Sequence, residues 1–163
     1  YDSKNDAYNI TSPDPTGEVV FTCMNNVLKQ YPLQKGEVIY VNAHGTGTLA
    51  NDEMELNALC KLVETNNDID KVWFSSTKSM LGHCLGAAGA IELAVCILCM
   101  QKEKMPLSIS VENKMDMPDY TILVTKEEES VPFDVCISNS YAFAGNLSCI
   151  GICKYKEEDL QYS

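Results

Sequence analysis

The chain contains two histidines, and each follows a short apolar run that is typical of a buried strand. His44 comes after residues 37–42, and His83 comes shortly after residues 71–76. Because the carboxyl ends of parallel strands meet at one edge of a sheet, both imidazoles are expected at the same edge. Glycines beside each histidine let a substrate approach the backbone, and an imidazole there can donate a hydrogen bond or move a proton. The alternative interpretation is two hydrogen-bonded loop histidines without a catalytic role.

The glycines around His44 also raise the question of a phosphate-binding loop. Residues 45–48 read GTGT, which lacks the Walker spacing, and Gly-x-Gly without a third glycine is a weak signal. Lys78 and Ser79 do not follow a glycine-rich loop. The sequence therefore argues against nucleotide binding. It also contains no Gly-x-Ser-x-Gly elbow, which leaves a hydrolase as a weak alternative.

Eight cysteines could indicate a metal site, a redox site or a disulfide framework. Cys96 and Cys99 have the Cys-x-x-Cys spacing, but no second cysteine pair or nearby histidine completes a zinc set. Both lie within the apolar residues 95–100, where thiols act as small hydrophobic groups. We therefore expect core packing, no metal, and a reducing cytoplasmic location.

Composition limits the classes of partner. The 163 residues carry a net charge of -11, from 23 acidic residues and 12 basic ones, all of them lysine. Binding to nucleic acid or to an anionic membrane surface needs a basic footprint, which this chain lacks. The longest apolar stretch is interrupted by His83 and Glu92, so a membrane span is not expected either.

The pattern of apolar residues predicts strands that alternate with helices and end in a hairpin. Helices are expected over residues 19–31, from Asn51 or Asp52 onward, and over 85–102; strands are expected over 37–42, 71–76, 120–124, 135–138 and 147–153. This order indicates an α/β fold with a mostly parallel sheet, an antiparallel hairpin at its end and helices packed on it.

In four segments the chain resembles the C-terminal half of the β-ketoacyl-acyl carrier protein synthases, the condensing enzymes of the thiolase superfamily. The segments follow family order and spacing, and they are residues 6–17, 41–55, 76–92 and 138–145. The third is the most specific, because STKSMLGH is followed by LGAAGA and then by Glu92. The resemblance implies a thiolase-like layered fold, with residues 1–163 as a C-terminal domain that is incomplete without an N-terminal half.

The resemblance also implies a decarboxylating Claisen condensation between malonyl-acyl carrier protein and an acyl thioester, in fatty-acid or polyketide synthesis. His44 and His83 match the histidines that stabilise the enolate, and Lys78 with Glu92 matches a supporting charge network. Phe143 matches a gating residue whose backbone N–H helps to form the oxyanion hole. Supporting positions are Asp52, Glu55, Thr46 and Thr48. No metal or redox cofactor is needed, and the cysteine nucleophile belongs upstream of this chain.

The match is imperfect near the expected gate, because Ala142 and Ala144 stand where glycines are usual, and Asn9 replaces a common histidine. The altered hairpin at residues 141–147 favours one alternative, a non-catalytic ketosynthase-like subunit of the chain-length-factor type or a scaffold partner, whereas the presence of His44, Lys78 and His83 argues against it. Family members have a core strand just before the residues that match 1–3, so this chain is expected to begin at or past that strand's end. We therefore expect an N-terminal partner that supplies the cysteine, acyl carrier protein as substrate carrier, and a ketosynthase-type dimer. Since carrier proteins are acidic and this chain is acidic too, the carrier should dock mainly on the partner.

Overall fold

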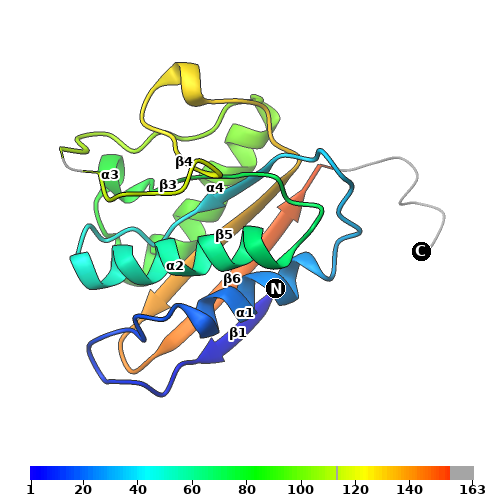
Figure 1. Ribbon diagram of the computed structural model, residues 1–163. Helices are drawn as coiled ribbons and strands as arrows, with labels where there is room; N and C mark the ends of the chain where they lie inside the picture. The colour runs from blue at the N-terminus through cyan, green and yellow to red at the C-terminus, as the bar shows by residue number, and fades with distance from the viewer. Residues whose placement is uncertain (113, 155–163) are drawn as a thin grey trace.

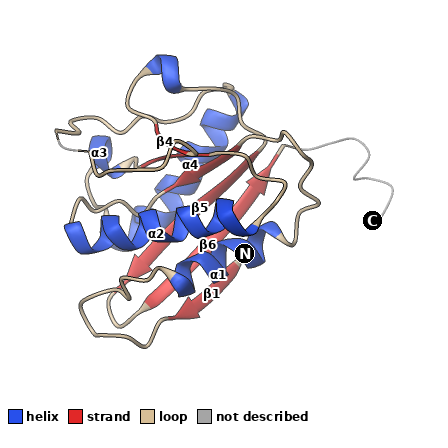
Figure 2. Cartoon of the chain, in the orientation of Figure 1, coloured by secondary structure: helices blue, strands red, loops and turns tan. Residues whose placement is uncertain are grey.

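Six strands form one sheet in the computed structural model, which describes residues 1–112 and 114–154 (Figures 1 and 2). In spatial order the strands are β1 (Asp2–Asn5), β6 (Asn146–Cys153), β5 (Val135–Ala142), β2 (Ile39–Asn42), β3 (Val72–Ser75) and β4 (Thr121–Leu123). Strands β5, β2, β3 and β4 are parallel to one another. Strand β6 lies between β5 and β1 and is antiparallel to both, so it alone runs in the opposite direction. The expected mostly parallel sheet with a terminal hairpin is confirmed.

Helices cover both faces of this sheet. Helices α1 (Glu18–Leu28) and α2 (Leu49–Thr65) lie on one face, and α4 (Ala88–Gln101) lies on the other (Figure 1). Strand β2 explains this arrangement, because its side chains alternate: Ile39 and Val41 pack under α1 and α2, whereas Tyr40 packs under α4. Three one-turn helices complete the described structure: α3 (Lys78–Leu81), η1 (Leu85–Ala87) and η2 (Glu127–Glu129).

The core on the α4 face contains Cys96 and Cys99, whose Cys-x-x-Cys spacing could have indicated a metal site. Cys96 is fully buried with Tyr40, Phe133 and Cys136, and Cys99 packs against this cluster. The prediction of core packing is confirmed for both. The described residues contain no group of three or more histidine, cysteine or acidic side chains that could hold a metal ion.

Helix α4 is apolar on nearly all sides, although only one side faces the sheet. Ile91, Ile97 and Leu98 are 37%, 42% and 54% exposed on its outer side. Such a contiguous apolar surface on a helix is typical of a face that another element covers. Among the residues that the structure describes, no helix has the length and hydrophobicity to cross a membrane.

Several element boundaries differ from the sequence-based expectations. Residues 2–5 were expected to lie at or past the end of a strand, but they form the edge strand β1, in register with residues 146–149 of β6. Helix α2 begins at Leu49, earlier than Asn51. The helix expected from Leu85 begins as η1, because Leu85 has a left-handed φ of 51° that the following α-helix cannot continue.

Candidate active site

Adjacent parallel strands bring the two histidines together. Asn42 at the end of β2 is in register with Ser75 at the end of β3. The segments that follow the two strands therefore leave the sheet at the same edge. The imidazole rings of His44 and His83 lie with centroids 5.5 Å apart and planes at 87°, in an edge-to-face arrangement. The structure thus places both rings at one edge, as the strand pattern predicts.

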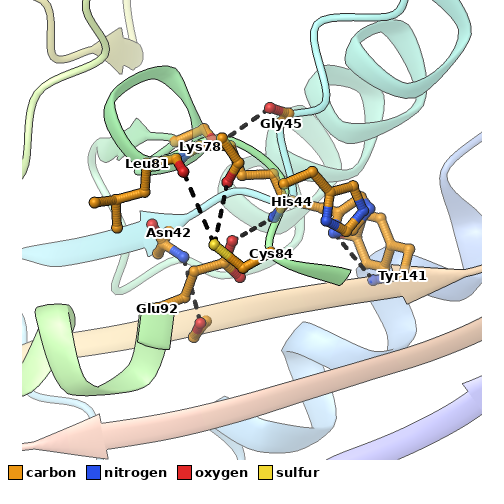
Figure 3. A network of polar contacts seen from close by, with 12 residues as sticks. Asn42, His44, Gly45, Lys78, Leu81, Cys84, Glu92 and Tyr141 are labelled. Carbon is orange, nitrogen blue, oxygen red and sulfur yellow. Dashed lines mark hydrogen bonds and ion pairs between the residues drawn. The ribbon is translucent and has the colours of Figure 1, made fainter. Parts of the chain in front are cut away.

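Backbone contacts define which nitrogen of each imidazole is free. The N–H of Tyr141 donates to Nδ1 of His44 over 3.3 Å (Figure 3). The N–H of Leu85 donates to Nδ1 of His83 over 3.2 Å. A neutral imidazole whose Nδ1 accepts a hydrogen bond carries its proton on Nε2. In their neutral forms both rings therefore offer an Nε2–H donor.

His44 is neutral at physiological pH. Burial lowers its pKa to about 3, with further contributions from the positive charge of Lys78 and from His83. The side chain is 7% exposed, so protonation would place a charge where water cannot solvate it. A neutral ring in such a place acts as a hydrogen-bond donor rather than as an acid.

Glu55 holds the loop that carries His44. Its Oε1 accepts the backbone N–H of His44 over 2.8 Å, and its Oε2 accepts the N–H of Gly45 over 2.7 Å and the amide of Asn51 over 2.8 Å. Burial raises the pKa of Glu55, and these hydrogen bonds oppose that increase. Asn51, which the sequence indicates only as a possible helix start within the segment 41–55, is thus part of the support.

Lys78 and Glu92 form a buried ion pair near His44 (Figure 3). Lys78 begins α3, Glu92 lies in the first half of α4, and their side chains are only 5% and 4% exposed. Lys78 Nζ contacts Oε1 of Glu92, while Oε2 of Glu92 has no hydrogen-bond partner among the described residues. The structure therefore pairs the two residues that the resemblance placed in one charge network.

The remaining supporting residues lie at the rim. The hydroxyls of Thr46 and Thr48 are 3.3 Å apart and exposed. Asp52 donates its backbone N–H to the carbonyl of Thr48 over 2.9 Å and accepts the amide of Asn51 at 3.3 Å. These contacts define the start of α2 rather than the histidine geometry.

Phe143 lies at the tip of the β5–β6 hairpin and is 77% exposed. Asn146 donates its amide to the Phe143 carbonyl over 2.9 Å, and Asn5 donates to the Ala144 carbonyl over 2.6 Å. Ala144 has a φ of 60°, in the left-handed region that favours glycine, whereas Ala142 does not. Of the two alanines that depart from the family pattern, only Ala144 is therefore strained.

Two cavities meet at His83 and Thr46. One, of about 560 Å³, is lined by both imidazoles, Phe143 and apolar side chains such as Ile10. The other, of about 660 Å³, lies toward Lys78. His83 and Thr46 line both cavities, and no cysteine lines either one among the described residues.

Comparison with known proteins decides the family. The family model described as "Beta-ketoacyl synthase, C-terminal domain" matches residues 1–112. This chain belongs to the β-ketoacyl synthase family. It is 40% identical over 140 residues to the 3-oxoacyl-[acyl-carrier-protein] synthase 2 of Coxiella burnetii, an alignment that covers 86% of this chain and 33% of that protein.

Solved structures of ketosynthases share the fold. A ketosynthase in complex with its chain length factor from Xenorhabdus doucetiae matches with a TM-score of 0.75 and 32% identity, over 93% of this chain and 37% of that one. A type II polyketide synthase acyl-carrier protein in complex with its ketosynthase matches with a TM-score of 0.77 and 27% identity, over 94% and 37%. This β-ketoacyl synthase chain spans about a third of the length of these relatives.

Proposed function

We propose that this chain supplies the histidine part of a condensing site that joins a malonyl unit to an acyl thioester with loss of CO₂. One observation carries the proposal: both imidazoles hold Nδ1 on a backbone N–H and so present Nε2–H donors from rings 5.5 Å apart. Two neighbouring Nε2–H donors, one on the buried His44 and one on the exposed His83, suit an enolate oxygen, which gains negative charge during the reaction.

In the first step the bond between the malonyl carboxylate and its neighbouring carbon breaks, and CO₂ leaves. The electron pair moves onto the thioester carbonyl, which becomes an enolate whose oxygen accepts hydrogen bonds from His44 and His83. Because His44 is held neutral, it donates a hydrogen bond without delivering a proton that would quench the carbanion. Lys78 contributes positive charge that opposes protonation of His44 and stays tied to Glu92.

In the second step the enolate carbon attacks the carbonyl carbon of an acyl group held on a cysteine. The new carbon–carbon bond forms as the bond from that carbon to the cysteine sulfur breaks, and the sulfur leaves as a thiolate. The Phe143 backbone would contribute to an oxyanion hole at this stage. No cysteine among the described residues lines the cavity with the two histidines, so the nucleophile must come from another segment.

The proposed condensation needs two binding surfaces, one for the segment that carries the nucleophile and one for acyl carrier protein. The segment that carries the nucleophile would cover the outer side of α4, where Ile91, Ile97 and Leu98 are exposed. Acyl carrier protein would deliver the malonyl and acyl groups, as one solved relative is a ketosynthase in complex with its carrier protein. With a net charge of -11, this chain offers the acidic carrier little attraction, so the carrier would dock mainly on that segment or on the second subunit of a dimer.

A second candidate function is a ketosynthase-like subunit without condensing activity. The strained Ala144 beside Phe143 favours it, because the added methyl group restricts the turn that would form the gate. Loading of an acyl group separates the two candidates. Incubation of the native protein with acyl-acyl carrier protein, followed by intact-mass analysis, should show one acyl adduct on a cysteine of an associated segment or partner. Absence of any adduct, with the protein folded, would favour the non-catalytic subunit.

A further inference from the structure

Ala7 and Ala144 both have a left-handed backbone conformation, with φ angles of 51° and 60°. In this region the Cβ of an L-amino acid crowds the following carbonyl oxygen, so alanine adopts it only where other contacts hold the backbone. Ala7 lies just after β1, and Ala144 lies at the tip of the β5–β6 hairpin. The N–H of Asp6 donates to the Gly145 carbonyl over 3.0 Å, so the two strained alanines lie in neighbouring segments.

The side-chain amide of Asn5 bonds to both alanines. Its Oδ1 accepts the N–H of Ala7 over 2.8 Å, and its Nδ2 donates to the carbonyl of Ala144 over 2.6 Å. Strand pairing places the amide there, because Asn5 ends β1 in register with Asn146, the first residue of β6. A single carboxamide therefore bridges the two residues of these segments that have left-handed strain.

Further backbone contacts hold the hairpin tip against residues 5–10. The N–H of Ala144 donates to the Ile10 carbonyl over 2.8 Å. Gly145 has a φ of 71°, and a Cβ at this residue would collide with Oδ1 of Asp6. The Phe143 side chain is 77% exposed, so packing of its ring does little to fix the turn. The position of the turn at residues 143–145 thus depends on its contacts with residues 5–10.

The two segments form one wall of the cavity that both histidines line. Asp6 and Ile10 line the cavity from one segment, and Phe143 and Gly145 line it from the other. A change in the contact between the segments therefore changes the wall beside the imidazoles.

We propose that Asn5 is a positioning residue for Phe143. Its two hydrogen bonds, here called the Asn5 bridge, offset the left-handed strain at Ala7 and Ala144 and hold the 143–145 turn in place. The bridge keeps an alanine at position 144 in a conformation that glycine adopts without strain. The Asn5 bridge is independent of the proposed condensation; only its effect on catalysis rests on that function.

Hydrogen–deuterium exchange of the full-length protein tests the Asn5 bridge. Asn5→Ala removes both hydrogen bonds, and we expect about tenfold faster exchange in the peptides that span residues 5–10 and 143–146. Asn5→Asp keeps the acceptor for Ala7 but loses the donor to Ala144, so exchange at the hairpin tip should rise here too. Unchanged exchange at the tip in both variants would overturn the proposal.

Asn57→Ala is the matched control for the loss of an exposed asparagine amide. Asn57 is exposed like Asn5, and its Nδ2 donates to the carbonyl of Pro15 over 2.9 Å, away from the cavity. We expect Asn57→Ala to leave exchange in both peptides at the wild-type rate. An equal acceleration in Asn57→Ala would mean that the effect is not specific to the bridge and would overturn the proposal.

A second pair of variants tests whether strain is what the bridge offsets. Ala144→Gly in the Asn5→Ala background should slow exchange at the tip about 2–5-fold relative to Asn5→Ala alone, after correction for intrinsic exchange rates. Ala142 has no left-handed φ, so Ala142→Gly in the same background should restore no protection. Failure of Ala144→Gly to restore protection would contradict the role of strain.

Kinetics test the link to Phe143, which rests on the proposed function. If the Phe143 backbone N–H contributes to the oxyanion hole, Asn5→Ala should lower the ratio of condensation to malonyl decarboxylation by up to about 10²-fold. Faster exchange with an unchanged ratio would reject the positioning of Phe143. Faster exchange in a protein whose wild type shows no condensation would reject the proposed function and support the Asn5 bridge.

Discussion

Replacement of Lys78 by Met tests the buried ion pair between Lys78 and Glu92. Lys78 and Glu92 are 5% and 4% exposed, and Oε2 of Glu92 already has no partner. Without Lys78 the carboxylate would remain buried with neither oxygen paired. Removal of one member of such a pair costs about 3–5 kcal/mol, because the remaining charge cannot regain its hydration.

Two further variants serve as references for the stability that Lys78→Met loses. Lys61 forms an ion pair with Glu18 at 2.5 Å, but the side chains are 35% and 57% exposed. Lys61→Met should therefore cost about 0–1 kcal/mol. The double variant Lys78→Met/Glu92→Leu replaces both charges by apolar groups and should recover most of the loss, since such replacements are often neutral.

Urea unfolding of the full-length protein at pH 7 measures these differences, with both single variants and the double variant forming a thermodynamic cycle. We expect the double variant to be more stable than either single variant. A Lys78→Met variant no less stable than Lys61→Met would refute the reasoning. So would additive losses in the cycle, because they would mean that the two groups do not depend on each other.

Three further predictions concern the loops and His44. Gly17→Ala should cost about 1–3 kcal/mol more than Gly36→Ala; both residues have positive φ, but a Cβ at Gly17 would lie 2.5 Å from the Met54 carbonyl oxygen and one at Gly36 meets nothing within 4 Å. Equal losses in denaturant unfolding would contradict the packing argument. Because the pKa of His44 is about 3, well below its unfolded value, stability should fall as the pH falls from about 6.5 toward 3, and His44→Asn should flatten that dependence. Ala144→Gly should raise stability by about 0.5–1 kcal/mol, since relief of the left-handed strain exceeds the added chain entropy; a lower Tm would show that the turn is not strained.

The sequence predicts the parallel core of the fold well, because each central strand is a short apolar run that ends at a polar motif. Strand β1 escapes prediction for a physical reason: residues 2–5 read DSKN and have no apolar alternation, and they form a strand only because the edge of β6 offers unpaired backbone groups. Helix α3 is a single turn and carries too few residues for a periodic signal.

In the candidate site, too, the sequence predicts some contacts and not others. The spacing of His44 and His83 after two strands predicts their meeting, since neighbouring parallel strands must end at one edge. The supporting contacts of Asn51 and Tyr141 could not be predicted, because they depend on which face of α2 and β5 packs near the His44 loop. Only the resemblance pointed to the pairing of Lys78 with Glu92, fourteen residues apart along the chain.

Decarboxylation of a malonyl thioester tests the central claim most directly, because it isolates the step that the two histidines would perform. The variants are His44→Ala, His83→Ala and their combination in the full-length protein, with Lys61→Met as a control at a surface ion pair. Loss of one donor to a developing oxyanion costs about 10²–10³-fold in rate, and loss of the second should cost less than the product because the two act as a unit. Rates in both single variants equal to that of the wild type, with the protein folded, would contradict the account.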